Sequence, residues 1–395
     1  MADSEMQAVG YITPGPIKTE HSLLDIDLDK PQLLPSSSPG GATSSSSATK
    51  TNGGGDGHGK NHIISDYDMI VHIKAVAVNT IDVRMRNGKP PPIGEPFRVL
   101  GYDTSGVVES CGVEATNKGF KVGDYVYYSG CVSRQGNNSE YHLVDSRLVG
   151  YKPKNVSHGV AAAFPMSSIV AWEMLFTKLH LHLLSKEDLV DSENGNDNEL
   201  IILIVGGATG IGSMAIQLLR VLAPTITIIA TASRPVAKDW VRDLGAHYIL
   251  DERWPLKKQI DALNLGRQPQ FVFSTVNNTQ NHLDDIVQCI APYGALGVVD
   301  DGGNMEFLDV VVLKKKSITI HWVYAFTRSL YNHDIQKVSY ILNEVSKLIE
   351  SKKIKSIVNE IAGQIDADTL KKVHGQIERN DIPYGQIVLQ GFPLD

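Results

Sequence analysis

The sequence predicts an α/β fold in which a doubly wound parallel sheet is joined to a second, β-rich domain. Three observations support this prediction. Residues 200–205 form a continuous apolar run, which is typical of a parallel strand buried on both faces. A glycine-rich turn and a helical stretch follow this run directly. Short apolar strands then alternate with helical segments up to residue 323, whereas the chain before residue 149 is mostly strand-like.

The β-rich part shows apolar–polar alternation interrupted by glycine-containing turns. This pattern predicts strands at residues 6–11, 23–28, 69–76, 99–111 and 124–128. The spacing of apolar residues then becomes helical at residues 161–179.

The parallel sheet is predicted from strands at residues 200–205, 225–232, 246–250, 271–274, 295–299 and 317–323. Helices are predicted at residues 210–222 and 236–244, and Gly245 is a typical stop for the second. An amphipathic helix at residues 335–349 and a strand at residues 386–389 complete the expected elements.

Residues 35–62 differ in composition from the rest of the chain. They are almost wholly Ser, Gly, Thr, Pro, Asn and Lys. Such a stretch cannot bury enough apolar surface to offset the entropy lost on ordering. Because strand-like sequence lies on both sides, we expect a disordered insertion outside the active cleft. A second polar loop is expected at residues 185–199.

Composition narrows the class of protein. The chain has 395 residues, enough for two domains, and 42% of them are hydrophobic. The net charge is 37 − 44 = −7 without a dense basic run, which argues against a nucleic-acid partner. The sequence has no apolar run long enough to predict a membrane span, and residues 1–10 do not resemble a secretory signal. Three scattered cysteines, Cys111, Cys131 and Cys289, suit a reducing compartment, so a cytoplasmic location is expected.

The glycine-rich turn is the strongest functional motif. It lies between an expected strand and an expected helix, the context of a dinucleotide-binding turn in a Rossmann domain. Glycines allow close approach of a pyrophosphate, and the helix N-terminus offers free N–H groups to it. A merely tight turn is the alternative, since Thr209 stands where the usual pattern has glycine. The predicted cofactor-binding residues here are Gly207, Ala208, Thr209, Gly210, Ile211 and Gly212.

The end of the second parallel strand favours NADPH over NADH. NAD-binding proteins usually place Asp or Glu there to hold the ribose hydroxyls. Here Ser233 and Arg234 follow the strand, and Lys238 lies one turn later. A guanidinium suits a 2′-phosphate by charge and geometry. We therefore expect these three residues to bind NADPH, the alternative being that Arg234 is an ordinary surface cation.

The order of these parts resembles the medium-chain dehydrogenase/reductase superfamily. The strings VNTIDVR (78–84), GYDTSGVV (101–108) and GATGIG (207–212) are similar to its quinone oxidoreductase branch. Residues 300–301, 321–322 and 326–329 resemble a subgroup called zinc-type alcohol dehydrogenase-like. The resemblance implies a GroES-like catalytic domain at 1–165 and 327–395, a Rossmann domain at 166–326, and a homodimer formed through edge strands of the Rossmann sheets.

The resemblance also bears on metal. Zinc alcohol dehydrogenases of this superfamily need a Cys where Asn79 stands and a His-Glu pair where Tyr102 and Asp103 stand. A catalytic zinc takes three protein ligands, commonly Cys, His or carboxylate. Only Asp103 has a suitable side chain, and three scattered cysteines cannot form a four-cysteine structural site. We therefore expect a protein that works without metal.

Two residues are predicted to be catalytic. Asn79 matches the Asn that relatives place beside the nicotinamide, where it would orient the ribose or the substrate carbonyl; a turn-capping Asn is the alternative. Tyr102 is the candidate donor to a substrate oxygen. Relatives often carry a Thr near the nicotinamide where Val170 stands, so Ser167 and Ser168 are considered in its place.

Without zinc, little polarises a simple carbonyl oxygen. Quinones and α,β-unsaturated carbonyls spread the developing charge themselves, so the sequence favours an NADPH-dependent reductase of such small molecules. A zinc-free aldehyde or alcohol dehydrogenase and an NADPH-binding regulatory protein with little turnover are the alternatives. No nucleic-acid or membrane partner is expected.

Overall fold

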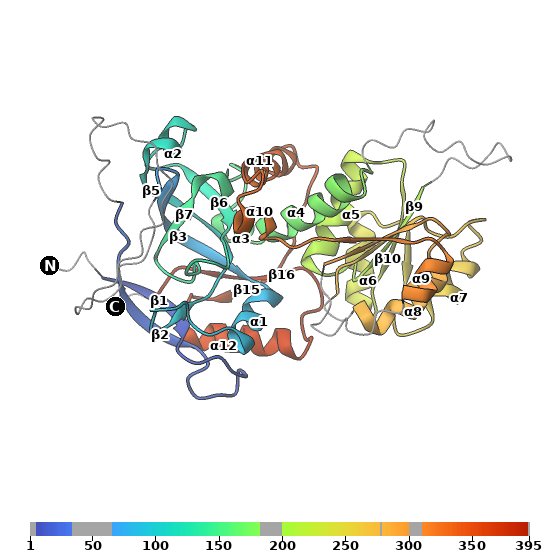
Figure 1. Cartoon of the computed structure of the whole chain (residues 1–395), viewed down its shortest axis with the longest axis horizontal. Helices are drawn as coiled ribbons and strands as arrows, with labels where there is room; N and C mark the ends of the chain where they lie inside the picture. Colours follow the sequence, from blue (N-terminus) through green and yellow to red (C-terminus); the bar gives the residue numbers. More distant parts are fainter. Residues whose placement is uncertain (1–4, 34–64, 182–199, 277–278, 300–309, 394–395) are drawn as a thin grey trace.

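A computed structural model describes residues 5–33, 65–181, 200–276, 279–299 and 310–393. The predicted insertion at 35–62 and polar loop at 185–199 lie outside these residues. Two lobes lie side by side along the long axis of the molecule, and the C-terminal segment returns to the lobe that holds the N-terminal strands (Figure 1). The boundary predicted at residue 165 falls at the first residue of α4 (Pro165–Trp172), and the one at residue 326 falls just before α10 (Thr327–Tyr331).

The first lobe is built on β3 (Asp68–Val78), the longest strand. It pairs antiparallel with β5 (Asp103–Cys111), β7 (Tyr141–Asp145) and β16 (Gln386–Gln390). The remaining strands of this sheet are β6 (Tyr125–Ser129), β8 (Val149–Tyr151) and β15 (Val358–Gly363). A smaller sheet joins β1 (Glu5–Tyr11) to β2 (Leu24–Asp29) and β4 (Arg98–Val99). The predicted β-rich domain and its C-terminal strand are thus confirmed.

Among the residues described, the second lobe holds six parallel strands in the spatial order β11-β10-β9-β12-β13-β14. This order, 3-2-1-4-5-6 in the sequence of the strands, is that of a doubly wound dinucleotide-binding sheet. The prediction of this sheet is confirmed. Its strands are β9 (Ile201–Val205), β10 (Thr227–Thr231), β11 (Tyr248–Leu250), β12 (Phe271–Ser274), β13 (Ala295–Val298) and β14 (Thr319–Trp322).

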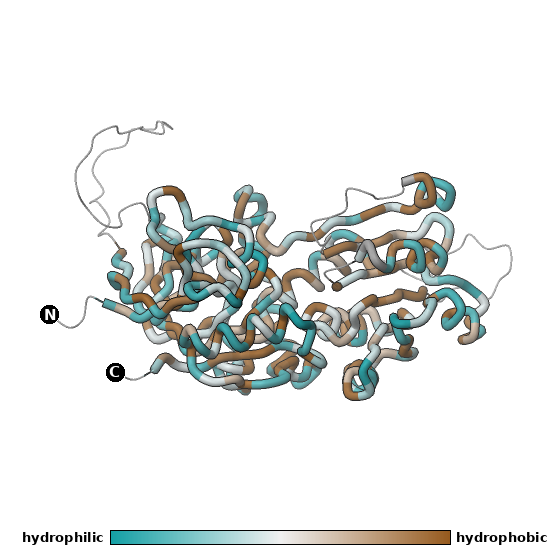
Figure 2. Tube along the Cα trace, turned by 90° about the horizontal axis from the view of Figure 1, so that it is seen from below, coloured by the Kyte–Doolittle hydropathy of each residue, from teal (hydrophilic) through white to brown (hydrophobic). Residues whose placement is uncertain are grey.

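Helices cover both faces of this sheet. On one face, Ile202 and Ile204 of β9 pack in a cluster with α5 (Gly210–Leu222) and α6 (Pro235–Leu244). On the other, Ile201 and Leu203 pack in a cluster with α7 (Leu256–Ala262), α8 (Leu283–Cys289) and α9 (Val310–Lys315). Burial on both faces explains the continuous apolar run of β9. Figure 2 shows hydrophobic stretches in both lobes.

The most apolar helical stretch, residues 158–178, has the length and hydropathy of a membrane span, but 83% of its most apolar window lies inside the protein. It consists of α3 (His158–Ala162), α4 and the π-helical segment Glu173–Lys178. Helix α4 packs against α5 and α11 (Gln336–Glu350), so the stretch is a core helix between the lobes.

One prediction about the first lobe was wrong, and three of its helices were not predicted. The single strand expected at 99–111 is divided into β4 and β5, because Gly101 has φ +94°, outside the range of extended strands. Helix α1 (Thr80–Gly88) was not predicted, and neither were the short α2 (Val113–Asn117) and α12 (Ala367–Glu378). Helix α1 buries Asp82 and Arg86 together with Val83 and Met85, which obscures its apolar spacing.

Candidate functional site

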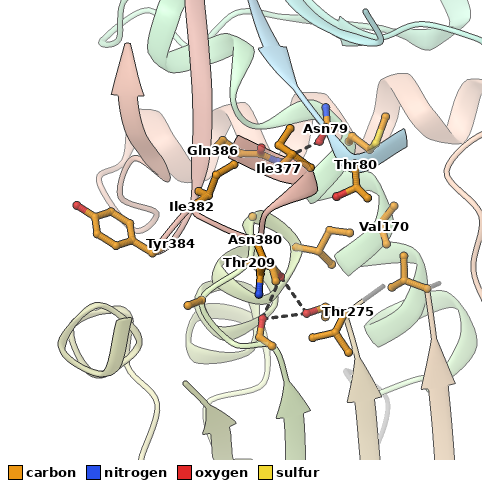
Figure 3. A pocket seen from close by; sticks show the side chains of 18 of the residues that line it. Asn79, Thr80, Val170, Thr209, Thr275, Ile377, Asn380, Ile382, Tyr384 and Gln386 are labelled. Atoms are coloured by element: carbon orange, nitrogen blue, oxygen red, sulfur yellow. Dashed lines mark hydrogen bonds between the residues drawn. The ribbon is translucent and has the colours of Figure 1, made fainter. Parts of the chain in front are cut away.

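A cavity of about 430 Å³ is lined by residues of both lobes. The second lobe contributes the glycine-rich turn and the residues that follow β10, β11 and β12. The first lobe contributes the start of α1 and the segment 377–386, which leads into β16. In Figure 3, Asn79 and Gln386 lie in the upper part of the view, and Thr209 and Thr275 lie below them, above the ends of the strands.

The glycine-rich turn has the geometry of a phosphate-binding turn. Gly206 adopts φ +82°, and a Cβ on Gly212 would lie 2.2 Å from the Gly206 carbonyl oxygen. The Thr209 hydroxyl caps α5 by accepting a hydrogen bond from Gly212 N at 3.0 Å. The non-glycine Thr209 therefore supports the turn instead of disrupting it.

The six residues predicted at this turn divide into two groups. Ala208, Thr209, Gly210 and Ile211 line the cavity, whereas Gly207 and Gly212 are not part of its lining. Gly207 packs closely on the sheet, because a Cβ there would lie 2.8 Å from Ala230 Cβ, whereas Gly212 packs on the backbone of Gly206 and Gly207. The N-terminus of the long helix α5 lies at the cavity with its positive dipole end, and Thr209, Gly210 and Ile211 line the cavity there. The residues present therefore fit the pyrophosphate of a dinucleotide.

The segment before β16 spans the glycine-rich turn. Gly385 N donates to Ala208 O at 2.8 Å, and the ring of Tyr384 stacks on Trp240 of α6 with centroids 4.4 Å apart. These contacts join the lobes beside the cavity.

The adenosine end predicted from Ser233 and Arg234 is a mixed-charge region. Both residues line the cavity, and Arg234 donates from Nη2 to the Asn380 carbonyl. Lys238 is not part of the lining; its ammonium pairs with Asp251 at 2.9 Å. The hydrogen bonds from Arg253 and Lys238 hold the pKa of Asp251 well below its usual range.

Asn79 is the N-cap residue of α1 and the centre of a buried hydrogen-bond network. Its Nδ2 donates to Asp103 Oδ2 at 3.0 Å, and its Oδ1 accepts from Gln386 Nε2 at 3.0 Å. Its backbone N–H donates to Asp82 Oδ2 at 2.8 Å. Gln386 Nε2 also lies 3.1 Å from Ser167 Oγ. The capping interpretation and the site interpretation of Asn79 are therefore compatible, since the same residue begins α1 and lines the cavity.

The two carboxyl groups behind Asn79 are fully buried. Burial raises the pKa of Asp82 to about 7 and that of Asp103 to about 8, although donated hydrogen bonds oppose both shifts. Asp103 Oδ1 also accepts from Met166 N at 2.9 Å. Asp103 thus connects the start of α4 to Asn79.

Tyr102 lies apart from the cavity. Its side chain is fully buried, and its ring packs edge-on against Phe326, which does line the cavity. Burial raises the pKa of Tyr102 far above its usual range. Val170 reaches the wall, whereas Ser167 and Ser168 do not. Sequence reasoning missed Gln386 and Thr80; Thr80 follows Asn79 directly and lines the cavity.

Comparisons with known proteins agree with this geometry. Residues 65–174 match the model of the alcohol dehydrogenase GroES-like domain, and residues 210–342 match that of the zinc-binding dehydrogenase family. The chain is 36% identical to a candidate zinc-dependent alcohol dehydrogenase of Rhizobium etli, over 99% of both chains and with a TM-score of 0.81. The chain belongs to the medium-chain dehydrogenase/reductase superfamily. It is therefore an oxidoreductase that uses a nicotinamide cofactor.

The chain is also similar to two further proteins. A zinc-type alcohol dehydrogenase-like protein of Staphylococcus aureus is 29% identical over 82% of this chain and 90% of its own length. A quinone oxidoreductase of Pseudomonas syringae pv. tomato is 21% identical over 98% of this chain and 99% of its own, with a TM-score of 0.71, which shows the same fold. The predicted superfamily membership is confirmed.

Two of these relatives carry zinc in their names. The side chains of this chain at the corresponding positions do not suit a catalytic zinc. Asn79 and Tyr102 offer an amide and a buried phenol, and the oxygens of Asp103 already accept from Asn79 and Met166. Catalytic zinc prefers Cys, His and carboxylate ligands. Within the described parts of the chain, no three His, Cys, Asp or Glu side chains gather into a metal-binding group.

Proposed function

We propose that this protein is a zinc-independent, NADPH-dependent oxidoreductase that reduces quinones or α,β-unsaturated carbonyls by hydride transfer. The observation that carries the proposal is the structure of the cavity around the Asn79 side chain. Its amide is held by Asp103 and Gln386, and the wall around it includes the apolar side chains of Met166, Val170 and Phe326. Such a site can orient a flat conjugated molecule without strongly polarising an isolated carbonyl.

When bound, the cofactor supplies a hydride to the conjugated carbon or to the quinone oxygen. The protein supplies position and a dry environment. Asn79 is fixed through both of its side-chain polar atoms, so it presents one defined orientation to the ribose or to the substrate carbonyl. The turn from Gly206 to Gly212 holds the pyrophosphate at the N-terminus of α5.

The proton that completes the reduction comes from solvent or from a hydroxyl group on the wall. Tyr102 is separated from the cavity by burial, so it is a poor donor in this arrangement. Thr80 lines the cavity next to Asn79. We therefore propose Thr80 in place of Tyr102 as the hydroxyl nearest the reacting atoms.

The cofactor part of the proposal rests on Arg234. Its guanidinium lines the cavity, and the hydrogen bond to the Asn380 carbonyl holds it there. A charge-assisted contact with a 2′-phosphate should make NADPH bind at least tenfold more tightly than NADH, or about 1.4 kcal/mol. A cytoplasmic location and a homodimer remain part of this proposal.

The test is oxidation of NADPH with a panel of quinones, enals and saturated aldehydes, before and after treatment with a chelator. The proposal predicts turnover of quinones or enals, weak turnover of saturated aldehydes, and well under one zinc per chain by elemental analysis. Preferred turnover of saturated aldehydes would favour the aldehyde reductase, and no turnover at all would favour a regulatory protein. Loss of activity on removal of stoichiometric zinc would refute metal independence.

A further inference from the structure

The adenosine end of the cavity contains a carboxyl group, which comes from the chain after β11 and not from the chain after β10. Glu252 lines the cavity together with Ser233 and Arg234. It comes from the neighbouring strand: β11 runs parallel to β10 with Leu250 opposite Thr231. Glu252 and Ser233 therefore each follow the last paired residue of their strand by two positions, and both emerge at the same edge of the sheet.

Glu252 differs from the acid beside it. Asp251 is neutralised by Lys238 at 2.9 Å and by Arg253 at 2.7 Å. The Oε2 atom of Glu252 is enclosed and has no hydrogen-bond partner in the described parts of the chain. An enclosed carboxylate oxygen without a donor is unfavourable, so a ligand that brings an O–H group would stabilise it.

The cations near this acid are mostly engaged elsewhere. Lys238 and Arg253 both pair with Asp251, which leaves Arg234 as the cation that lines the cavity at this end among the residues described. Arg253 also donates from Nη2 to the Ser233 carbonyl at 3.0 Å but is not part of the lining, so the charged groups of the lining that a bound 2′-phosphate would meet here are the guanidinium of Arg234 and the carboxylate of Glu252. A bound ribose diol would instead donate a hydrogen bond to the carboxylate.

We propose that Glu252 is a specificity-determining residue that accepts a hydrogen bond from the adenosine ribose of NADH and repels the 2′-phosphate of NADPH. It opposes Arg234, so that both cofactors bind and the preference for NADPH is smaller than Arg234 alone would give. This inference rests on the cofactor part of the proposed function and names the residue that limits it.

The experiment compares dissociation constants for NADPH and NADH by fluorescence titration in the parent and in Glu252→Gln. Removal of one negative charge should raise the ratio of the NADH constant to the NADPH constant at least about fivefold, which corresponds to roughly 1 kcal/mol. Glu252→Lys should raise the ratio further. Arg234→Ala should lower it, and combining it with Glu252→Gln should return it towards the parent value.

Asp261→Asn is the matched control, because it removes an exposed charge on α7 that pairs with Lys257. This variant should keep the ratio within about twofold of the parent, under 0.5 kcal/mol. If Glu252→Gln unfolds, Glu252→Ala and Glu252→Lys are titrated below their melting temperatures. A ratio unchanged in every folded Glu252 variant would overturn the inference. Failure of the proposed function looks different: the parent would bind NADH more tightly or would not reduce quinones and enals, whatever the variants do to the ratio.

Discussion

The two ends of the cavity are built in different ways. Most residues of the pyrophosphate and adenosine end come from one stretch of chain, 206–252, where the turn is held by the local contact of Thr209 with Gly212. The segment 380–385 completes this end through Asn380, which accepts from Arg234, and Gly385, which donates to Ala208. The end around Asn79 is assembled from distant segments: Asp103 lies 24 residues away, and Gln386 lies 307 residues away.

This difference indicates where each end is vulnerable. A locally built turn depends on the size of single residues, because backbone atoms are already in contact there. A network assembled from distant segments depends on hydrogen bonds and on the charge of its buried acids. Substitutions at the first end should therefore change cofactor affinity, and those at the second should change turnover.

The largest effect is expected from Gly212→Ala. The new Cβ would lie 2.2 Å from the Gly206 carbonyl oxygen, so the phosphate-binding turn must open. NADPH affinity should fall by at least about a hundredfold, or roughly 2.7 kcal/mol, in a fluorescence titration. Gly88→Ala is the control, since a Cβ there meets nothing within 4 Å. Equal affinities for both variants would show that the turn does not hold the cofactor.

Asn79→Ala should act on turnover. It leaves Asp103 and Gln386 without their shared partner, and an unpaired buried polar group costs about 1–3 kcal/mol. We expect kcat to fall by about thirtyfold, roughly 2 kcal/mol, while the NADPH dissociation constant stays within about threefold. The exposed Asn117→Ala, on α2, should change neither value. A normal kcat in Asn79→Ala would show that Asn79 acts only as the N-cap of α1.

A smaller change in cofactor affinity is expected from Arg234→Ala, which alters the adenosine end of the cavity. It removes the guanidinium that lines the cavity, so most of the expected tenfold preference for NADPH, about 1.4 kcal/mol, should disappear. Turnover at saturating cofactor should be unchanged, because the residue lies away from Asn79. Titration gives the dissociation constants of NADPH and NADH for this variant. An undiminished preference for NADPH would show that other residues bind the 2′-phosphate.

Protonation of the buried acids should make stability depend on pH. Folded-state pKa values of about 7 for Asp82 and about 8 for Asp103 lie above the ordinary 3.8, so the folded protein holds more protons than the unfolded chain and loses stability as pH rises. Half-buried His158 and buried His374 have lowered pKa values, so their effect on stability rises with pH only up to about pH 6.5. The effect of the acids should therefore appear cleanly between about pH 6.5 and 8.

In that range the melting temperature should fall by about 1 °C or more, the shift expected for roughly 1 kcal/mol in a chain of 395 residues. Asp103→Asn should flatten this dependence even if it lowers the melting temperature throughout, whereas Asp261→Asn should preserve it. Differential scanning fluorimetry at several pH values measures both slopes. Parallel slopes for the parent and Asp103→Asn would show that Asp103 does not titrate there.

The smallest effect is expected from residues 35–62, whose composition predicts an insertion outside the cleft. Replacing them with a short Gly/Ser linker should leave NADPH affinity and turnover within about twofold, because loop-closure entropy grows only slowly with length. A larger loss of turnover in a folded variant would place this segment at the active site.

The two ends also differed in how far the sequence could predict them. The apolar run of β9, the glycines after it and the stop at Gly245 are local signals, and the sheet and turn were found from them. The partners of Asn79 carry no local signal, since nothing near Gln386 in the chain indicates that it meets Asn79 and Ser167. Glu252 carries no signal at the end of β10, because it follows the neighbouring strand β11 by two residues. The signal that points to Glu252 is the side-by-side ending of the parallel strands β10 and β11.

The central claim is hydride transfer to a conjugated acceptor without help from a metal. Its most direct test uses chelator-treated protein, an α,β-unsaturated aldehyde and NADPH that carries deuterium at the transferring position. The account predicts a saturated aldehyde with deuterium on the β-carbon and a solvent proton on the α-carbon. Deuterium on the carbonyl carbon of an unsaturated alcohol would contradict the account and identify an aldehyde reductase.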